Sequence, residues 1–210
     1  IIPVMNGTDP GDRTRTILDK GIVIDSLIYI IAFSNPDFSI LQQGDIARLV
    51  IGIQNASEQQ WQYVEEVSAI LSGADIDCST AHDIQTEIWR KYILNCAYNV
   101  TTACYENTIG QIRRDPEKTR NYETLAKEAW QVALAKGIGV TQDHIDQILY
   151  QFHHIYGDDA TSSLQRDILQ GHRTELETFS GYLVREARAL NVPVPVSEWM
   201  YEELKKKAII

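Results

Sequence analysis

The sequence is short of cysteine, of net positive charge and of long uncharged apolar runs. Its 210 residues include 3 cysteines, 19 Lys and Arg and 29 Asp and Glu, which give a net charge of -10. Cysteines at no metal-ligand spacing predict no metal site and suit a reducing compartment. The acidic balance opposes binding to nucleic acid or to an anionic membrane surface, and no apolar run is fit to span a bilayer. We therefore expect a cytoplasmic protein that binds neither nucleic acid nor membrane.

The sequence also lacks the Gly-rich turn that usually holds a dinucleotide. It contains no GxGxxG, the motif that presents backbone amides and a helix N-terminus to a pyrophosphate. Its histidines form no zinc pattern, and it has no nucleophile elbow. The first methionine is Met5. We therefore expect a piece of a longer polypeptide, with negligible dinucleotide-dependent activity by itself.

Strand and helix signals alternate over the first 80 residues. The runs Ile2 to Met5, Gly21 to Phe33 and Arg48 to Ile53 are rich in β-branched residues, as buried strands are. Asp9-Pro10 is typical of a helix start, and Ser57 with Gln60 predicts a capping box. Residues 1–80 are therefore expected to be the trailing part of an α/β sheet.

From residue 81 onward the pattern is helical. One helix is expected to end near Tyr105, a second to begin at Asp115 and a third at Thr141. A long helical segment should run from about Thr161 to Leu190, and a short helix capped by Ser197 should follow. The sequence therefore predicts an all-α domain over residues 81–210.

A stripe of polar residues crosses the first of these helices. Lys91, Asn95 and Asn99 recur every four residues, and no charged residue stands between Lys91 and Glu106. A lysine in such an apolar helix can reach water along its own stem, and buried amides can satisfy backbone carbonyls; spacing alone favours this ordinary interpretation. An enclosed ammonium must otherwise meet an anion, a carbonyl or a water-filled cleft, which would be a functional site.

Two further features are weaker. Ser163, Asp167, Gly171 and Glu175 also recur every four residues, and a glycine in mid-helix usually indicates close approach by another group. A solvated helix face would give the same pattern. Asn6 directly follows the first predicted strand, where α/β sheets bind ligands, although an ordinary turn explains it equally.

Together these stretches resemble the ketopantoate reductases, the NADPH-dependent 2-dehydropantoate 2-reductase family. The resemblance lies in EIWRKYILNCAYNVTTA, SSLQRDILQGHRTELETFSG and the strand that leads to Asn6, in that order. It spans essentially the whole chain but begins partway into the family sequence. It implies a remnant of a Rossmann-like sheet over residues 1–80 and, over 81–210, a helical substrate-binding domain resembling that of 6-phosphogluconate dehydrogenase. It also implies reduction of 2-dehydropantoate to pantoate, in pantothenate and coenzyme A biosynthesis.

The resemblance further implies roles for individual residues. Lys91 would be the general acid that protonates the alkoxide formed when hydride reaches the ketone carbon, and Glu175 would hold the substrate hydroxyl. A lysine suits this chemistry because its cation stabilises the developing charge and its proton then neutralises it. The remaining implied contacts are Asn95, Asn99 and Ser163 to the substrate, and Asn6 to the nicotinamide of NADPH.

The chain departs from the family pattern at two positions, where Ile109 and Ala160 replace asparagines. The exact keto acid therefore stays open. One alternative is a reductase of another branched 2-keto acid on the same architecture. Another is a helical dimerisation module without activity, and a homodimer through the helical domain is compatible with all three interpretations.

Overall fold

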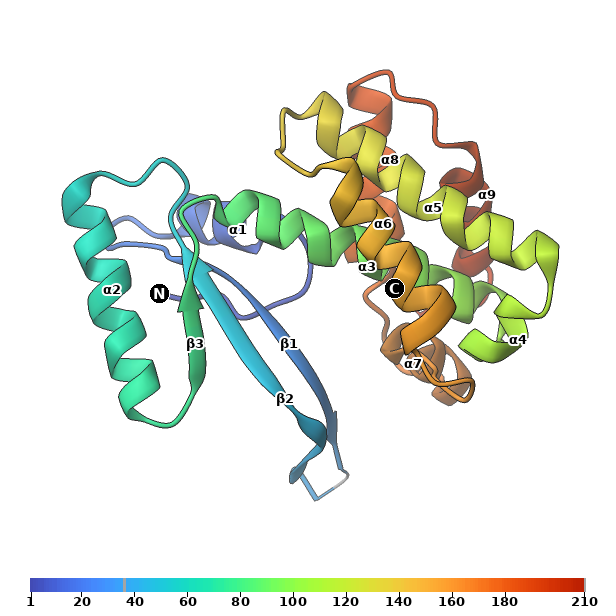
Figure 1. The fold of residues 1–210 in the computed structure, drawn as a ribbon, viewed down its shortest axis with the longest axis horizontal. Coiled ribbons are helices and arrows are strands. Elements are labelled where there is room, and N and C mark those ends of the chain that lie inside the picture. Colours follow the sequence, from blue (N-terminus) through green and yellow to red (C-terminus); the bar gives the residue numbers. More distant parts are fainter. Residues whose placement is uncertain (36, 210) are drawn as a thin grey trace. The chain divides into compact units, whose positions relative to one another are not determined.

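The structure, a computed structural model, describes residues 1–35 and 37–209. The chain divides into two compact units, Ile1–Ile88 and Trp89–Ile210. The first contains a three-stranded sheet with two helices, and the second consists of helices and short connections (Figure 1). The predicted order of an α/β region followed by a helical domain is therefore confirmed.

The sheet of the first unit has the order β1-β2-β3. Strands β1 (Asp25–Ser34) and β2 (Ile40–Gly52) pair antiparallel, and the short β3 (Asp77–Thr80) pairs parallel with β2. The unit also contains α1 (Pro10–Ile17) and α2 (Glu58–Gly73), which runs alongside β3 (Figure 1). The predicted capping box at the start of α2 is confirmed, because Ser57 and Gln60 bond reciprocally.

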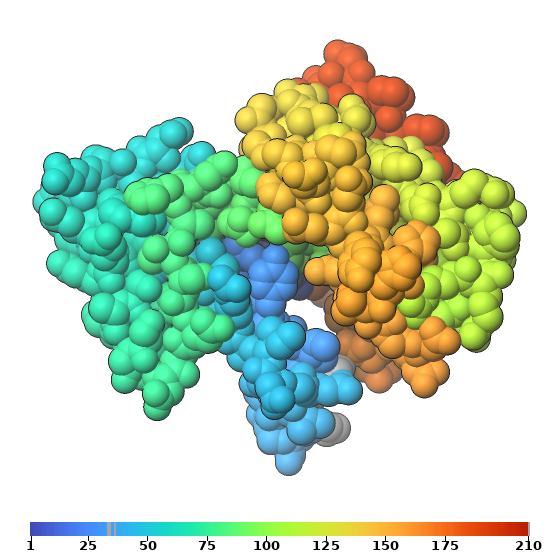
Figure 2. Space-filling model, in the orientation of Figure 1, coloured from blue at the N-terminus to red at the C-terminus, as the bar shows by residue number. Residues whose placement is uncertain are grey.

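Side chains at the end of β2 are buried on both faces of the sheet. Leu49 and Ile51 pack with Val64 of α2, whereas Val50, which points the other way, packs with Leu27 and Ile84. The beginning of β2 is different, because the side chains of residues 40–46 are exposed, and their atoms lie at the surface in Figure 2. The core of this unit therefore sits at one end of the hairpin.

The first predicted strand, Ile2 to Met5, is not a strand. Ile1, just before this segment, makes isolated hydrogen bonds, from its N-terminal amine to the Ile22 carbonyl (2.8 Å) and from the Ile24 amide to its own carbonyl (3.0 Å). Pro3 has no amide hydrogen to donate, and its carbonyl accepts from the Ser26 hydroxyl instead (3.0 Å). The β-branched run was therefore a misleading signal here.

Gly52, the last residue of β2, allows a close approach of two segments. A Cβ atom at this position would lie 2.2 Å from the Ala81 carbonyl oxygen and 2.9 Å from Cβ of Ile84. We expect Gly52→Ala to lower the free energy of unfolding by about 1–3 kcal/mol, measured by urea denaturation. Gly73→Ala is the matched control, because nothing lies within 4 Å of its Cβ position. A Gly52→Ala protein as stable as Gly73→Ala would contradict the close approach.

The second unit is built from helices around one core. The chain enters it through α3 (Ile84–Tyr105), whose first residues belong to the first unit. The other elements, with two π-helical turns labelled η, are α4 (Ile109–Arg113), α5 (Pro116–Ala135), α6 (Gln142–Tyr150), η1 (Gln151–Ile155), α7 (Ser163–Gln170), η2 (Glu177–Gly181), α8 (Tyr182–Ala189) and α9 (Pro195–Lys205). Within the described part of the chain, no helix has the length and apolar character needed to cross a bilayer.

The long helix predicted from Thr161 to Leu190 is interrupted. Helix α7 ends at Gln170, the next residue, Gly171, has a left-handed backbone (φ +66°), and no helix follows until Leu176. Nothing lies within 4 Å of the Cβ position of Gly171, so the predicted close approach at this glycine is wrong. Gly171 instead ends the helix, because glycine adopts the left-handed conformation at low cost. Ser163 and Glu175 therefore do not share one helix face.

The last helix also begins differently from the prediction. Helix α9 starts at Pro195, and Ser197 lies inside it rather than capping it. Its first amides are bonded by Glu128 of α5, whose carboxylate accepts from the amides of Val196 (3.0 Å) and Ser197 (2.8 Å). The Ser197 hydroxyl donates to the same carboxylate (2.6 Å). A distant side chain thus replaces the local cap.

Candidate active site

Helix α3 carries the polar stripe, and no charged residue follows Lys91 in this helix. Its neighbours Tyr92, Ile93 and Cys96 are buried in the core of the second unit, which fixes the helix along its length. Lys91 and Asn95 are partly exposed, and Asn99 is 7% exposed. Side chains four residues apart lie on one helix face, so Lys91, Asn95 and Asn99 share a face. The core contacts of Tyr92, Ile93 and Cys96 hold the helix in the orientation that presents this face.

A hydrogen-bonded chain links the stripe to α7. Nδ2 of Asn99 donates to Oδ1 of Asn95 (3.4 Å), and the hydroxyl of Ser163, at the start of α7, donates to Oδ1 of Asn99 (3.3 Å). Both bonds are long, so a ligand oxygen could displace them at small cost. A buried bond from the Thr102 hydroxyl to Ser162 Oγ (2.7 Å) fastens the start of α7 to α3. The structure therefore brings Asn95, Asn99 and Ser163 together.

Lys91 and Glu175 interact electrostatically in the same unit. Burial lowers the pKa of Lys91 from 10.5 to about 8, although the charge of Glu175 acts to raise it. Glu175 lies just before the helix that begins at Leu176, and its carbonyl accepts from the amides of Thr178 (2.9 Å) and Phe179 (3.1 Å). An amine with this pKa is mostly protonated at neutral pH and gives up its proton far more readily than an ordinary lysine.

Asn6, the sixth predicted residue, lies in the first unit. It is partly buried in the loop before α1, and Gly7 beside it has a left-handed backbone (φ +101°). The other five predicted residues all belong to the second unit. The structure thus assembles five of the six within one unit, and Asn6 is not one of that group.

The helix N-termini of the first unit do not fit the pyrophosphate of a dinucleotide. Neither α1 nor α2 begins with a Gly-rich turn, and each has an acidic residue in its first turn, Asp12 and Glu58. A carboxylate at a helix N-terminus opposes a bound phosphate group. In the described part of the chain no cluster of three or more His, Cys, Asp or Glu side chains is placed to hold a metal ion.

The two positions that depart from the family pattern lie side by side. The Ile109 amide donates to the Ala160 carbonyl (3.0 Å), and the Ile109 side chain is fully buried. Both side chains pack in or against the core of the second unit. An apolar Ile109 in the core cannot offer a hydrogen bond to a ligand.

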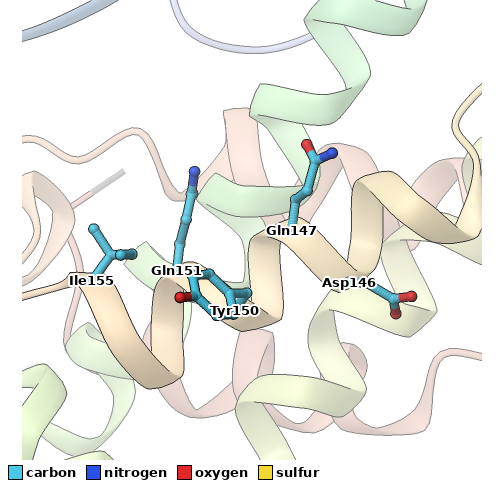
Figure 3. A pocket seen from close by; sticks show the side chains of 5 residues that line it. All are labelled: Asp146, Gln147, Tyr150, Gln151 and Ile155. Carbon is cyan, nitrogen blue, oxygen red and sulfur yellow. The ribbon is translucent and has the colours of Figure 1, made fainter.

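A hollow in the second unit is separate from these residues. It has a volume of about 500 Å³ and is lined by Asp146, Gln147, Tyr150, Gln151 and Ile155 (Figure 3). All five come from the continuous helical stretch of α6 and η1, so the hollow is an open groove along one helix. None of the predicted site residues lines it. The polar stripe, with its perturbed lysine, is the better candidate for chemistry.

Sequence reasoning missed Tyr92, Thr102 and Ser162 as supports of the site. Thr102 and Ser162 join α3 to α7, and the Tyr92 hydroxyl donates to the Phe179 carbonyl in η2 (2.6 Å). The partners are 60 and 87 residues apart in the chain. No local pattern could have shown these contacts.

Comparison with known proteins places the chain in a family. Residues 83–208 match the family described as "Ketopantoate reductase PanE/ApbA C terminal". The 2-dehydropantoate 2-reductase of Shigella flexneri is 26% identical over 162 residues, which are 77% of this chain and 52% of that protein. The chain thus spans about half the length of the curated relatives it matches.

Solved structures share the fold. A ketopantoate reductase from Ralstonia eutropha JMP134 has a TM-score of 0.84 at 24% identity, covering 98% of this chain and 65% of that one. A dimeric ketopantoate reductase from Staphylococcus aureus has a TM-score of 0.84 at 23% identity, covering 99% and 67%. At these identities the likeness concerns the fold alone. Since the match to the family over residues 83–208 covers more than half of the sequence, the chain belongs to the ketopantoate reductase family.

Proposed function

We propose that this chain supplies the substrate-binding part of an NADPH-dependent enzyme that reduces 2-dehydropantoate to pantoate, in pantothenate and coenzyme A biosynthesis. The observation that carries the proposal is the partly buried ammonium of Lys91, which interacts with Glu175. Lys91 lies on the same face of α3 as Asn95 and Asn99. Because neither α1 nor α2 fits a pyrophosphate, we propose that sequence outside this chain holds the dinucleotide phosphates.

Lys91 is assigned the proton transfer. Reduction of a ketone leaves negative charge on its oxygen, and a nearby ammonium stabilises that charge as it develops. The proton then passes from Nζ to the oxygen, which yields the alcohol and leaves a neutral amine. A lysine with a pKa of about 8 suits both steps, since it is charged at pH 7 and is a stronger acid than an exposed lysine.

The neutral polar groups are assigned to orientation of the substrate. The amides of Asn95 and Asn99 and the hydroxyl of Ser163 can donate to substrate oxygens without neutralising Lys91, whereas an added carboxylate would lock the ammonium in an ion pair. Glu175 can accept a hydrogen bond from a substrate hydroxyl. Asn6 is assigned to the nicotinamide on the resemblance alone.

Two other functions are carried as alternatives. The first is reduction of another branched 2-keto acid. Ile109 and Ala160 support it, because each takes the place of an asparagine in the family pattern and so removes a polar side chain. A dimerisation module without activity is the other. A homodimer through the helical domain is a proposal in either case; among the relatives, the Staphylococcus aureus reductase is described as dimeric.

The test is an assay of NADPH oxidation with ketopantoate and with other branched 2-keto acids. We expect no turnover by the 210-residue chain, and turnover by a polypeptide that extends upstream to include a Gly-rich strand-turn-helix. Higher kcat/KM on another keto acid would select the first alternative. If Lys91→Ala left the rate intact while an apolar substitution in the helical domain changed the mass in solution, the dimerisation module would be correct.

A further inference from the structure

Tyr92, the residue after Lys91, makes a buried tertiary hydrogen bond near the candidate site. Its side chain is 1% exposed, and its hydroxyl donates to the Phe179 carbonyl at 2.6 Å. Its ring also packs edge-on against Trp89 (5.2 Å between centroids) and Tyr182 (5.8 Å). A short hydrogen bond inside a packed aromatic cluster holds its two ends in one geometry.

The other end of this bond lies in η2, which follows Glu175. The Phe179 amide donates to the Glu175 carbonyl (3.1 Å), while the Phe179 carbonyl accepts from Tyr92. Lys91 and Glu175 are thus connected by one peptide bond and two hydrogen bonds through Tyr92 and Phe179. A π-helical turn in a helix is an irregularity often found at functional sites, and this one is where α3 and the Glu175 segment are joined.

The turn is anchored on its other side by Glu177. Its carboxylate accepts from Arg185 (2.6 Å) and from the Tyr201 hydroxyl of α9. A Cβ atom on Gly181 would lie 2.3 Å from Oε2 of Glu177, so the absence of a side chain there makes room for the carboxylate. With η2 bonded to Arg185 and to α9 through Glu177, the Tyr92 hydroxyl supplies a hydrogen bond from α3 to the turn that follows Glu175.

From this geometry we infer that Tyr92 is a positioning residue, whose hydroxyl fixes the separation of Lys91 and Glu175 through η2. The expected effect of the Tyr92 hydroxyl on turnover rests on the proposed function, but its expected effect on the separation of Lys91 and Glu175 does not. Without the hydroxyl, the Phe179 carbonyl keeps its bond from the Tyr182 amide, and the Glu175 segment is free to move away from α3.

The test is the pKa of Lys91 in Tyr92→Phe, measured on the 210-residue chain by NMR of lysine side chains and assigned from Lys91→Met. Glu175 acts to raise this pKa, so moving the carboxylate away should lower it below the wild-type value of about 8. Glu175→Gln sets the limit of that shift. In the Glu175→Gln background, Tyr92→Phe should cause no further change.

Tyr122→Phe is the matched control. Tyr122 is also fully buried, and its hydroxyl has no hydrogen-bond partner among the described residues, so its removal should leave the pKa of Lys91 unchanged. An unchanged or raised pKa in Tyr92→Phe, or an equal shift with and without Glu175, would overturn the inference. Should Tyr92→Phe not fold, Tyr92→Met, which is smaller and flexible and also lacks a hydroxyl donor, gives the same comparison.

Turnover separates this inference from the proposed function. In the active, longer polypeptide we expect Tyr92→Phe to lower kcat on the order of ten-fold with a smaller change in KM, because misplaced groups lose transition-state contacts first. A lowered pKa of Lys91 in a protein without reductase activity would uphold the positioning role and refute the proposed function. If the wild-type polypeptide were an active reductase but Tyr92→Phe left the pKa of Lys91 unchanged, the proposed function would be upheld and the positioning role refuted.

Discussion

Lys91→Met is expected to lower turnover of ketopantoate by about a thousand-fold in the active polypeptide. The substitution removes both the proton donor and the cation that stabilises the alkoxide, and general acid catalysis alone contributes roughly 10²–10⁴-fold. Steady-state kinetics on purified protein measure the loss. Lys127→Met, a change at an exposed lysine on α5, is the control and should keep the wild-type rate. A Lys91→Met enzyme within three-fold of wild type would remove the general acid from the proposal.

The wild-type rate should also depend on pH in a defined direction. The protonated amine is the acid, so kcat/KM should be level below the Lys91 pKa of about 8 and fall about ten-fold per pH unit above it. The inflection should be absent in Lys91→Met. A rate that rises through pH 8 would mean that the neutral amine is the active form.

Lys91→Met should also stabilise the fold. Burial lowers the pKa of Lys91, so the buried positive charge destabilises the folded chain. This destabilisation is fully present below pH 8 and disappears as the pH rises toward 10.5. We expect Lys91→Met to raise the free energy of unfolding at pH 7 by about 1 kcal/mol, an amount discounted for the solvent access of this partly exposed amine. The gain should fade between pH 8 and 10.5, as urea denaturation at several pH values would reveal.

Local signals in the sequence predicted much of the fold. Ser57 and Asp115 accept from amides at the starts of α2 and α5, as predicted, because a cap is a contact within one turn. The stripe of Lys91, Asn95 and Asn99 was visible because helical spacing alone brings these residues onto one face. Such features depend on neighbours in the sequence and on little else.

The features that sequence reasoning missed depend on distant partners or on backbone conformation. Gly171 looked like a helix residue, but its left-handed backbone ends α7, and periodicity does not distinguish these two uses of glycine. Ser197 looked like a cap, but Glu128 supplies that function from α5. Tyr92 looked like one more apolar residue of α3, and its hydroxyl finds its acceptor 87 residues away. The support of the candidate site was therefore harder to predict than its polar residues.

Glu128 provides the largest expected effect on stability. It is 7% exposed, and its carboxylate accepts from the amides of Val196 and Ser197 and from the Ser197 hydroxyl. Glu128→Gln keeps the shape but replaces one acceptor oxygen with an NH₂ donor, which would face a donor of α9. We expect this change to lower the free energy of unfolding by about 3 kcal/mol, since it leaves a buried donor unsatisfied and weakens the remaining bonds.

Urea denaturation followed by tryptophan fluorescence measures this loss, and Trp199 reports on α9 directly. Ser197→Ala removes one of the three bonds and should cost about 1 kcal/mol, while the same change in the Glu128→Gln background should cost less because its acceptor is already impaired. Equal costs in both backgrounds would show that the hydroxyl and the carboxylate do not act together. Since Tyr201 of α9 bonds Glu177 in η2, a loosened α9 should also weaken the support behind Glu175. The cap supplied by Glu128 therefore links the stability of the last helix to the geometry of the candidate active site.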